Sequence, residues 1–296
     1  LLLPSSSSLS LSSSSSLSSP PFSTLLRILG SGAGGGVPQW NGTDDWNQSA
    51  REGKGEKRTQ CSAAILCPSS GEREEKGWIL VNCSPDFRFQ WNDLLVSHPG
   101  SVLRGILFTD AELDHVSGLL SLRESKTPIR LFGTSSILSN IESTGIPSLL
   151  RTYTAVEWGS LDDLLSSSLL PKEVDVWRIC QKRPKYADLS SDVLCVKGEK
   201  WVYVPCIPTE ESLLSVLETW GDISLCVTDG TFFSETEMPS VKGHLPVERT
   251  LSLFGVRGKP IPLFTRLNHT NQKMDPSLCL VDGEEIDLLT LCRRKR

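Results

Sequence analysis

The stretch Phe108-Thr109-Asp110-Ala111-Glu112-Leu113-Asp114-His115 places three carboxylates and one imidazole within six positions. It lies between the apolar run Leu103–Phe108 and the amphipathic run Val116–Leu122, where a strand is expected to give way to a helix. An extended segment directs residues i and i+2 to the same face, and the turn into a helix brings residues i+4 and i+5 back toward them. The spacing therefore predicts that four potential ligands converge on one point. The alternative is that Asp114 caps the following helix while the other two carboxylates are solvated in the loop.

The composition of the 296-residue chain is that of an ordinary globular protein, with 38% hydrophobic and 22% charged residues. A chain of this length can form one large domain or two small ones. The formal net charge of −5 argues against a broad phosphate-binding surface, so we expect no nucleic acid as a partner. No apolar run approaches the ~20 residues that span a bilayer, so we expect no membrane either. The oligomeric state is not predicted.

The cysteines indicate a reducing compartment. Their number, nine, is odd, and no two of them form a Cys-x-x-Cys pair. Such isolated thiols are expected to be mostly buried and free. They stand at positions 61, 67, 83, 180, 195, 206, 226, 279 and 292.

The two ends of the chain differ from the rest. Thirteen of residues 1–24 are serine, and no acidic residue appears before Asp44. Such a segment cannot bury a core, and its composition is that of an organellar transit peptide. Because it is poor in arginine, it favours a plastid; a cytoplasmic or mitochondrial location, or a plain low-complexity tail, is the alternative. At the other end, residues 291–296 are expected to form a solvated basic tail.

Between these ends, apolar runs and amphipathic runs alternate. This order predicts a layered α/β structure, and no internal boundary divides residues 25–290 into two domains. Strands are expected at Leu25–Leu29, Ser62–Cys67, Trp78–Cys83, Leu103–Phe108, Val193–Val196, Trp201–Val204 and Ile223–Val227, and helices near Pro85–Leu95, Asp114–Glu124, Ser135–Ser143 and Glu210–Trp220.

A glycine-rich segment follows the first expected strand. Five of residues 30–36 are glycine, but no Lys-Ser/Thr pair and no helix-forming run follow, so a nucleotide loop is not expected. Leu29-Gly30-Ser31-Gly32-Ala33-Gly34-Gly35-Gly36-Val37-Pro38-Gln39-Trp40-Asn41 resembles the N-terminal signature of the coenzyme PQQ synthesis protein B family. Further segments agree with this family in order: 58–62, 81–88, 109–115, 118–124, 229–232, 243–246 and 268–271.

This resemblance implies the metallo-β-lactamase fold, an αββα sandwich of two mixed β-sheets flanked by helices. Residues 110–115 then resemble the His-x-His-x-Asp-His signature of that superfamily, with Asp110 and Glu112 where the two leading histidines usually stand. The implied metal ligands are Asp114, His115, Asp229 and His244, and the metal is Fe²⁺, Zn²⁺ or Mn²⁺. For Asp229, a simple capping role in the Gly230 turn is the alternative.

Two departures from the family pattern stand out. Family members commonly carry a Cys-x-Cys-x-x-Cys cluster after the asparagine, whereas this chain has Gly42–Trp46 without a thiol. Arg266 replaces a ligand-type histidine, and a new imidazole, His269, is either a metal ligand or a core residue. The remaining histidine, His98, is expected in a solvated turn.

The resemblance implies a metal-dependent enzyme that oxidises a tyrosine-derived precursor of pyrroloquinoline quinone, with a small molecule or small peptide as substrate. Asp110, Glu112 and Asp114 would serve as catalytic groups. We assign Arg266, Asn268 and Asn271 to substrate binding, since an arginine can hold a carboxylate or phosphate with two hydrogen bonds. The alternatives are a metal-dependent hydrolase of a phosphoester or thioester, and a non-catalytic relative that has lost its metal.

Overall fold

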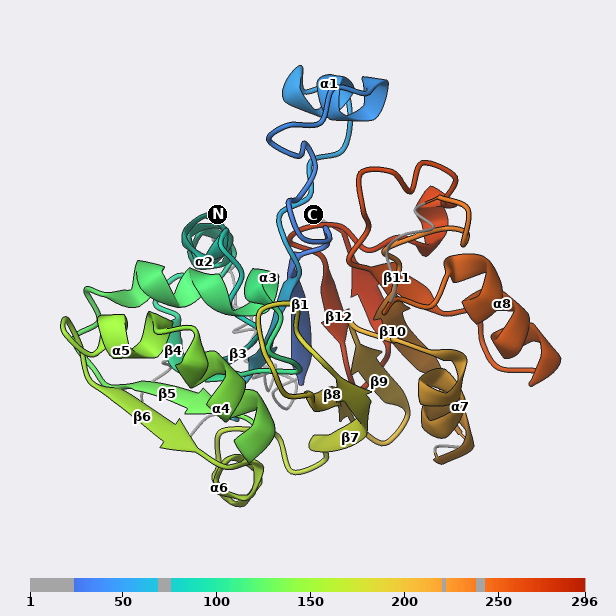
Figure 1. The fold of residues 1–296 in the computed structure, drawn as a ribbon. Coiled ribbons are helices and arrows are strands. Elements are labelled where there is room, and N and C mark those ends of the chain that lie inside the picture. Colours follow the sequence, from blue (N-terminus) through green and yellow to red (C-terminus); the bar gives the residue numbers. More distant parts are fainter. Residues whose placement is uncertain (1–23, 69–75, 220–221, 238–242, 296) are drawn as a thin grey trace, which may run out of the picture.

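The computed structural model describes residues 24–68, 76–219, 222–237 and 243–295. The predicted transit-like segment lies outside this range except for Thr24. Figure 1 shows two β-sheets with helices on their outer sides. Among the described residues, no helix has the length and the apolar composition that crossing a membrane requires.

The larger sheet has eight strands. β3, β4, β5 and β6 run parallel to one another, and the other neighbours are antiparallel. The parallel strand β3 is buried along its whole length, as expected where both faces of a sheet are covered. In spatial order the strands are β13 (Cys292–Arg294), β12 (Glu285–Asp287), β1 (Leu25–Gly30), β2 (Ser62–Leu66), β3 (Gly77–Val81), β4 (Val102–Leu107), β5 (Ile129–Phe132) and β6 (Val156–Gly159).

The smaller sheet has five strands. β9, β10 and β11 are parallel, whereas β7, β8 and β9 pair antiparallel. Both sheets are therefore mixed. Their order is β11 (Leu263–Thr265), β10 (Leu225–Asp229), β9 (Trp201–Val204), β8 (Ser191–Lys197) and β7 (Asp175–Lys182).

The helices lie outside the sheets, and their sequences explain where several of them begin. Thr134 accepts a hydrogen bond from Ile137 N at the start of α4, and Ser160 and Asp163 form a reciprocal capping box on α6. In Figure 1, α2 to α5 lie on one outer side, α7 and α8 on the other, and α1 at the tip of a projecting arm. The helices are α1 (Asp45–Arg51), α2 (Phe87–Ser97), α3 (Leu113–Val116), α4 (Ser135–Ser143), α5 (Ile146–Leu150), α6 (Leu161–Ser166), α7 (Glu210–Thr219) and α8 (Val247–Val256), with 3₁₀ helices η1 (Ser117–Leu122) and η2 (Pro276–Leu278).

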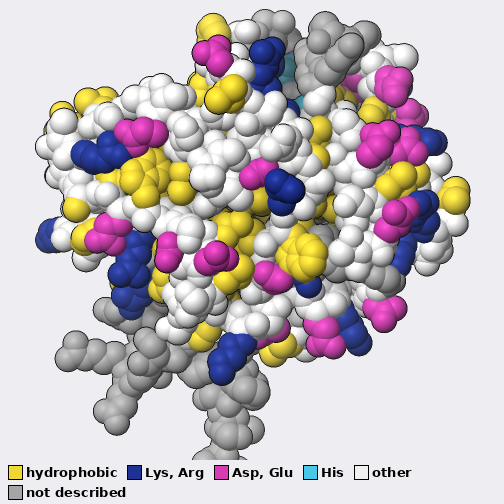
Figure 2. All heavy atoms as spheres, turned by 60° about the horizontal axis from the view of Figure 1, so that its bottom comes forward, with side chains coloured by type: hydrophobic (Ala, Val, Ile, Leu, Met, Phe, Trp, Pro, Cys, Tyr) yellow, Lys and Arg dark blue, Asp and Glu magenta, His cyan; other side chains and the backbone are white. Residues whose placement is uncertain are grey.

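The main hydrophobic core contains side chains of both sheets. Trp78 and Phe108 come from the region of the larger sheet and Tyr203 from the smaller one, and all three are fully buried. Burying an aromatic side chain of this kind contributes about 1.5–3 kcal/mol. On the face shown in Figure 2, acidic and basic side chains are interspersed, and exposed apolar side chains form small groups.

The acidic stretch begins where the two sheets are joined. Thr109 follows β4; its N–H donates to Asn82 Oδ1 over 2.9 Å, and its carbonyl accepts from Leu194 N of β8 over 2.7 Å. These bonds attach the start of the stretch to the turn after β3 and to the second sheet. The residues that follow therefore project from one edge of the sandwich.

The predicted fold class, an αββα sandwich with two mixed sheets, is confirmed. The helix expected over residues 114–124 is shorter, because α3 ends at Val116 and continues as the 3₁₀ helix η1. Gly118 packs directly on the chain there: a Cβ at this position would lie 2.0 Å from Ser84 O.

Two expectations about exposed segments were wrong. Cys292–Arg294, expected in a frayed basic tail, forms β13, and Arg293 Nε is paired with the buried Glu284. His98, expected in a solvated turn, is mostly buried; its ring lies 5.2 Å from that of Trp78 and its Nε2 lies 2.6 Å from Glu285 Oε1. In both cases a carboxylate near β12 supplies the partner that holds the basic side chain.

Candidate functional site

The glycine-rich segment passes close over the acidic stretch. A Cβ on Gly34 would lie 3.3 Å from Asp114 Oδ2, and one on Gly30 would lie 2.0 Å from Gln60 O. Gly32 bridges to Gln60 on one side and to Leu267 on the other. The glycines therefore allow close backbone approach, and they bring the segments that carry Asp114 and Leu267 together.

Asp110 and His115 form a buried carboxylate–imidazole pair. His115 Nδ1 donates to Asp110 Oδ1 over 2.6 Å, and the same oxygen accepts from Glu112 N. Burial lowers the pKa of His115, but the Asp110 charge outweighs it and raises the pKa to about 10. Among the described residues, His115 Nε2 has no hydrogen-bond partner; it lies 3.9 Å from Asp114 Oδ2. The pair thus presents one unsatisfied nitrogen toward Asp114.

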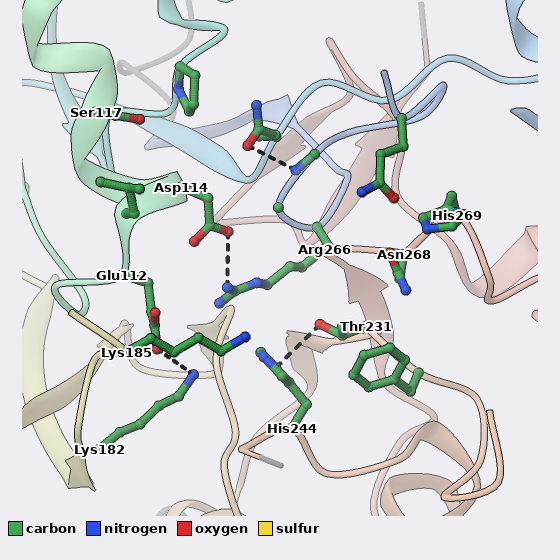
Figure 3. Close-up of a pocket in the computed structure, with 18 of the residues that line it drawn as sticks. Glu112, Asp114, Ser117, Lys182, Lys185, Thr231, His244, Arg266, Asn268 and His269 are labelled. Atoms are coloured by element: carbon green, nitrogen blue, oxygen red, sulfur yellow. Dashed lines mark hydrogen bonds and ion pairs between the residues drawn. The ribbon is translucent and has the colours of Figure 1, made fainter. Parts of the chain in front are cut away.

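Asp114 is held by Arg266. The guanidinium NH2 donates to Asp114 Oδ2 over 3.0 Å, and Arg266 is only 4% exposed. Burial raises the pKa of Asp114, but the charge of Arg266 lowers it below the ordinary value, and the charge of His115 adds to this. Within the described parts of the chain, Arg266 Nε and NH1 have no partner. Figure 3 shows the guanidinium extending between Asp114 and His244.

Asp229 and His244 form a second carboxylate–imidazole pair. His244 Nδ1 donates to Asp229 Oδ2 over 2.7 Å. Asp229 is almost fully buried and also accepts from Ile207 N and from both the N–H and the hydroxyl of Thr231. Burial raises the pKa of Asp229, but His244, the charge of Arg266 and the Thr231 hydroxyl lower it well below its usual range. One donor atom each of Cys206, Asp229 and His244 lie within 4.8 Å of one another.

A lysine–carboxylate pair completes the polar lining. Lys182 Nζ, at the end of β7, lies 2.9 Å from Glu112 Oε1 and 3.6 Å from Cys206 Sγ. Burial lowers the pKa of Lys182, but nearby negative groups raise it above the ordinary value. Tyr186 adds a hydroxyl that donates to Ala111 O.

These groups surround one cavity of about 670 Å³. Asp114, Arg266, Glu112, Lys182 and His244 line it (Figure 3). Asp110, His115 and Asp229 are buried and do not line it, and Asp229 orients His244 through its hydrogen bond. The lining carries more positive than negative side chains: Lys182, Arg183, Lys185 and Arg266 against Glu112 and Asp114. The cavity therefore suits a small anionic molecule.

His269 belongs to the connection with the projecting arm. Its Nδ1 lies 3.1 Å from Asn47 Nδ2 of α1 and 3.5 Å from Asp44 Oδ2. Asn47 is fully buried, and its Oδ1 accepts from Gln39 N over 2.5 Å. The arm is thus held by amide, carboxylate and imidazole groups at the place where the sequence lacks the family's thiols. His269 lines the cavity, but Figure 3 shows it on the far side of Arg266 from Asp114.

The residues assigned to substrate binding separate in the structure. Arg266 and Asn268 line the cavity. Asn271 does not: it is fully buried, and its Nδ2 donates to Gly230 O over 2.7 Å. The assignment of Asn271 is therefore corrected to a supporting role, because it holds the turn that carries Asp229.

Sequence reasoning missed several lining or neighbouring residues, among them Lys182, Cys206 and Thr231. Cys206 comes just after β9, and Asp229 is the last residue of the neighbouring strand β10. A thiol just after a predicted strand could therefore have marked Cys206 as a candidate site residue. Lys182 ends a strand that was not predicted. Thr231 lay inside a segment used for the family resemblance, but its hydroxyl bond to Asp229 could not be foreseen.

Comparison with known proteins agrees with the fold and covers most of the chain. The family model of the beta-lactamase superfamily domain matches residues 77–260. Coenzyme PQQ synthesis protein B of Methylobacterium sp. (strain 4-46) is 42% identical over 280 residues, which cover 82% of this chain and 89% of the relative. The protein of the same name from Methylococcus capsulatus is 28% identical over 285 residues, covering 85% of this chain and 91% of the relative.

Solved structures show the same fold. The crystal structure of Zn²⁺-bound PqqB from Methylobacterium extorquens superposes with a TM-score of 0.67 at 23% identity, covering 89% of this chain and 100% of that one. A diphosphatase of the PhnP family gives a TM-score of 0.63 at 14% identity, covering 89% of this chain and 97% of the diphosphatase. The family model and the 42% identical relative show that this chain belongs to the coenzyme PQQ synthesis protein B family within the beta-lactamase superfamily.

Proposed function

We propose that this chain is a metal-dependent enzyme that acts on a small anionic molecule in the cavity. The observation that carries the proposal is the buried His115 Nε2, which has no hydrogen-bond partner in the part of the chain that the structure describes and lies 3.9 Å from Asp114 Oδ2. Two donor atoms bound to one ion at about 2.1 Å each stand roughly 3–4 Å apart. Asp110 fixes Nδ1 of the same ring, which is how carboxylates orient metal-binding histidines and leave the other nitrogen free.

A second group of donors supports the same reading. Asp229 and His244 offer a carboxylate and an imidazole, and Cys206 adds a thiol close to both. We expect Asp114, His115, Asp229 and His244 to hold the ion, as the family resemblance implies. Imidazole and carboxylate ligands accept Fe²⁺, Zn²⁺ and Mn²⁺, so this donor set fits a divalent metal without selecting one.

When bound, the metal would supply either a redox-active centre or water with a pKa lowered toward ~7. The chain's own residues would bind and orient the substrate. Lys185 and Arg266 are placed to hold an anionic group, and Glu112 lines the cavity 2.9 Å from Lys182 Nζ, so a proton can pass between this pair and a bound molecule. Family membership supports the oxidation of a tyrosine-derived precursor of pyrroloquinoline quinone over hydrolysis of a phosphoester or thioester.

A second candidate, a relative without metal or catalysis, is favoured by one observation. Arg266 already compensates Asp114 over 3.0 Å, so the site holds a positive charge of its own. Under this reading the cavity would remain a binding site for an anion.

Metal analysis of the purified protein tests the proposal. After reconstitution with Fe²⁺ under anaerobic conditions, or with Zn²⁺, we expect about one ion per chain, and Asp114→Ala or His115→Ala should abolish it. His98→Ala removes a mostly buried imidazole elsewhere and should keep the ion, which controls for loss of fold. Asp162→Ala removes an exposed carboxylate and should also keep it. Absence of metal in the wild type under both conditions would contradict the proposal and leave the metal-free relative.

A second assay separates the two reactions. Hydrolysis of bis(p-nitrophenyl) phosphate by the metal-loaded wild type, lost in His115→Ala, would favour the hydrolase. We expect no such hydrolysis above the level of the His115→Ala variant.

A further inference from the structure

Arg266 enters the acidic site from a fixed backbone position. Its φ of 61° is left-handed, a conformation that is disfavoured for residues with a Cβ. The next residue is locked, because Leu267 N donates to Ser31 O over 2.8 Å and Ala33 N donates to Leu267 O over 2.9 Å. The side chain is thus directed into the site by the same contacts that seat the glycine-rich segment.

The guanidinium is buried but only partly satisfied. Only NH2 has a partner, Asp114, among the described residues. A buried charge of this kind is costly unless opposite charges compensate it. Burial raises the pKa values of Asp110, Asp114 and Asp229, and Arg266 is among the groups that lower them again. One guanidinium therefore serves carboxylates on both sides of the site.

One oxygen of Asp114, Oδ2, lies between the guanidinium of Arg266 and the nitrogen of His115 that would bind a metal. Asp114 Oδ2 lies 3.0 Å from Arg266 NH2 and 3.9 Å from His115 Nε2. We infer that Arg266 and a divalent metal are competing counter-charges for Asp114, so that metal binding requires the guanidinium to release this carboxylate. This inference rests on the proposed metal site and concerns a residue that stands where the family pattern has a ligand-type histidine.

Electrostatics supports the competition. An ion bonded to Asp114 Oδ2 would stand no more than about 5 Å from Arg266 NH2 in its present position. A divalent and a monovalent cation this close repel each other strongly in a buried site, where the effective dielectric constant is far below that of water. The site can keep both only if the guanidinium moves or if an anion enters between them.

The release of Arg266 has a consequence for substrate binding. Once the guanidinium has left Asp114, its N–H groups are available to another acceptor in the cavity, which Lys185 also lines. It can then bind a carboxylate or phosphate group with two hydrogen bonds. Metal binding would in this way prepare the cavity for its anionic substrate, and by linkage the anion would favour the metal.

Zinc titration calorimetry tests the competition with a matched pair of variants. Arg266→Met removes the charge at similar side-chain length, and Arg266→Lys keeps it. Each variant, and the wild type, is measured beside the same protein carrying His115→Ala, so that only His115-dependent binding is counted. We expect Arg266→Met to bind Zn²⁺ at least ~10-fold more tightly than the wild type, because the repulsion is removed. Arg266→Lys should stay within about threefold of the wild type.

Thermal melting gives a second readout. Without metal, Arg266→Met should melt below the wild type, because the carboxylates lose their counter-charge. Zn²⁺ should raise its melting temperature more than that of the wild type. If circular dichroism shows that Arg266→Met does not fold, Arg266→Gln against Arg266→Lys carries the same comparison, because glutamine removes the charge without adding an imidazole ligand, and the glutamine variant is expected to bind as tightly as stated for methionine.

The outcomes separate this inference from the proposed function. If the wild type binds Zn²⁺ and removal of the charge does not tighten binding, the competition is refuted and the metal-dependent function stands. If only the uncharged variants bind at His115, the competition is upheld and the metal-dependent function of the wild type fails. If no variant binds, both fail.

Discussion

The two carboxylate–imidazole pairs of the site look alike, yet they are supported differently. Asp229 is held by His244, by Ile207 N and by both donors of Thr231, and the charge of Arg266 adds to these hydrogen bonds. The Asp110–His115 pair is buried more deeply, and its free nitrogen faces Asp114, whose partner is Arg266. One side of the site is therefore largely self-supporting, with hydrogen-bond donors of its own besides the charge of Arg266, while Asp114 depends on the positive charge that Arg266 supplies.

This difference teaches where a cation matters most. Asp229 has enough donors to remain ordered whatever occupies the cavity. On the other side, His115 Nε2, which no described residue pairs, faces the Asp114 carboxylate, and this carboxylate needs either the guanidinium or an ion. We therefore expect changes on the Asp110 side to have larger effects on stability.

The largest effect should come from removing the carboxylate of the deeper pair. Asp110→Ala removes the charge that keeps His115 protonated and leaves His115 Nδ1 and Glu112 N without their acceptor, and breaking a buried pair in this way typically costs about 3–5 kcal/mol. Asp229→Ala leaves the partly accessible His244 and a few unpaired donors; each costs up to about 1–3 kcal/mol where it stays dry, and we expect a smaller total loss because Thr231 and His244 line the cavity. Urea unfolding of the metal-free proteins measures both, and equal losses or the reverse order would break the comparison.

The pH dependence of stability should also come from the deeper pair. The pKa of His115 rises from 6.5 to about 10 on folding. Its contribution is therefore fully present below pH 6.5 and is lost as the pH rises toward 10. We expect the free energy of unfolding of the metal-free wild type to fall by a few kcal/mol at most across this window, on the order set by the shift.

Variants identify the group responsible for this loss. In His115→Gln the fall between pH 6.5 and about 8 should disappear, whereas in His244→Gln it should persist. Nearer pH 10 the buried thiols, whose pKa values burial raises, add a fall of their own to every variant. A wild type whose stability is constant across the window would show that Asp110 and His115 do not share a charged hydrogen bond. The depressed pKa of Asp110 has the opposite sign: its contribution is lost only in acid, below its ordinary pKa of 3.8.

How much of this arrangement the sequence could predict differs between the two pairs. Asp110, Asp114 and His115 lie within one stretch, and the strand-to-helix spacing alone predicted that they converge. Asp229 and His244 came only from the family resemblance, because the loop between them is not constrained by local periodicity. The arginine was recognised as a departure, but its bond to a carboxylate 152 residues away is a tertiary contact that no local pattern encodes.

Among the strands, those in apolar runs were predicted and the edge strand β7 was not. β1, β2, β3, β4, β8, β9 and β10 lie in apolar runs and were expected within a few residues of their bounds. β7 was missed because Asp175–Lys182 mixes exposed and half-buried residues along an edge of the smaller sheet, and with it the position of Lys182 was missed. Edge strands carry a weak hydrophobic pattern because one side of their backbone is unpaired.

The smallest effect should come from trimming the supports of Asp229. Thr231→Val removes one hydroxyl donor, at 2.6 Å, and should cost about 1 kcal/mol, because Asp229 keeps two backbone donors. Thr228→Val is the matched control, on β10 just before Asp229: its buried hydroxyl has no partner among the described residues, so the change should be neutral or stabilising. A loss at Thr231 as large as that at Asp110 would show that the Asp229 side is not self-supporting.

Anomalous diffraction at the zinc edge, from crystals of the Zn²⁺-loaded wild type, tests the central claim most directly. The account predicts a zinc peak within bonding distance of His115 Nε2 and an Asp114 oxygen, with the guanidinium of Arg266 moved away from that carboxylate. A zinc ion bound elsewhere, or the Arg266–Asp114 pair unchanged beside a zinc ion at His115, would contradict it.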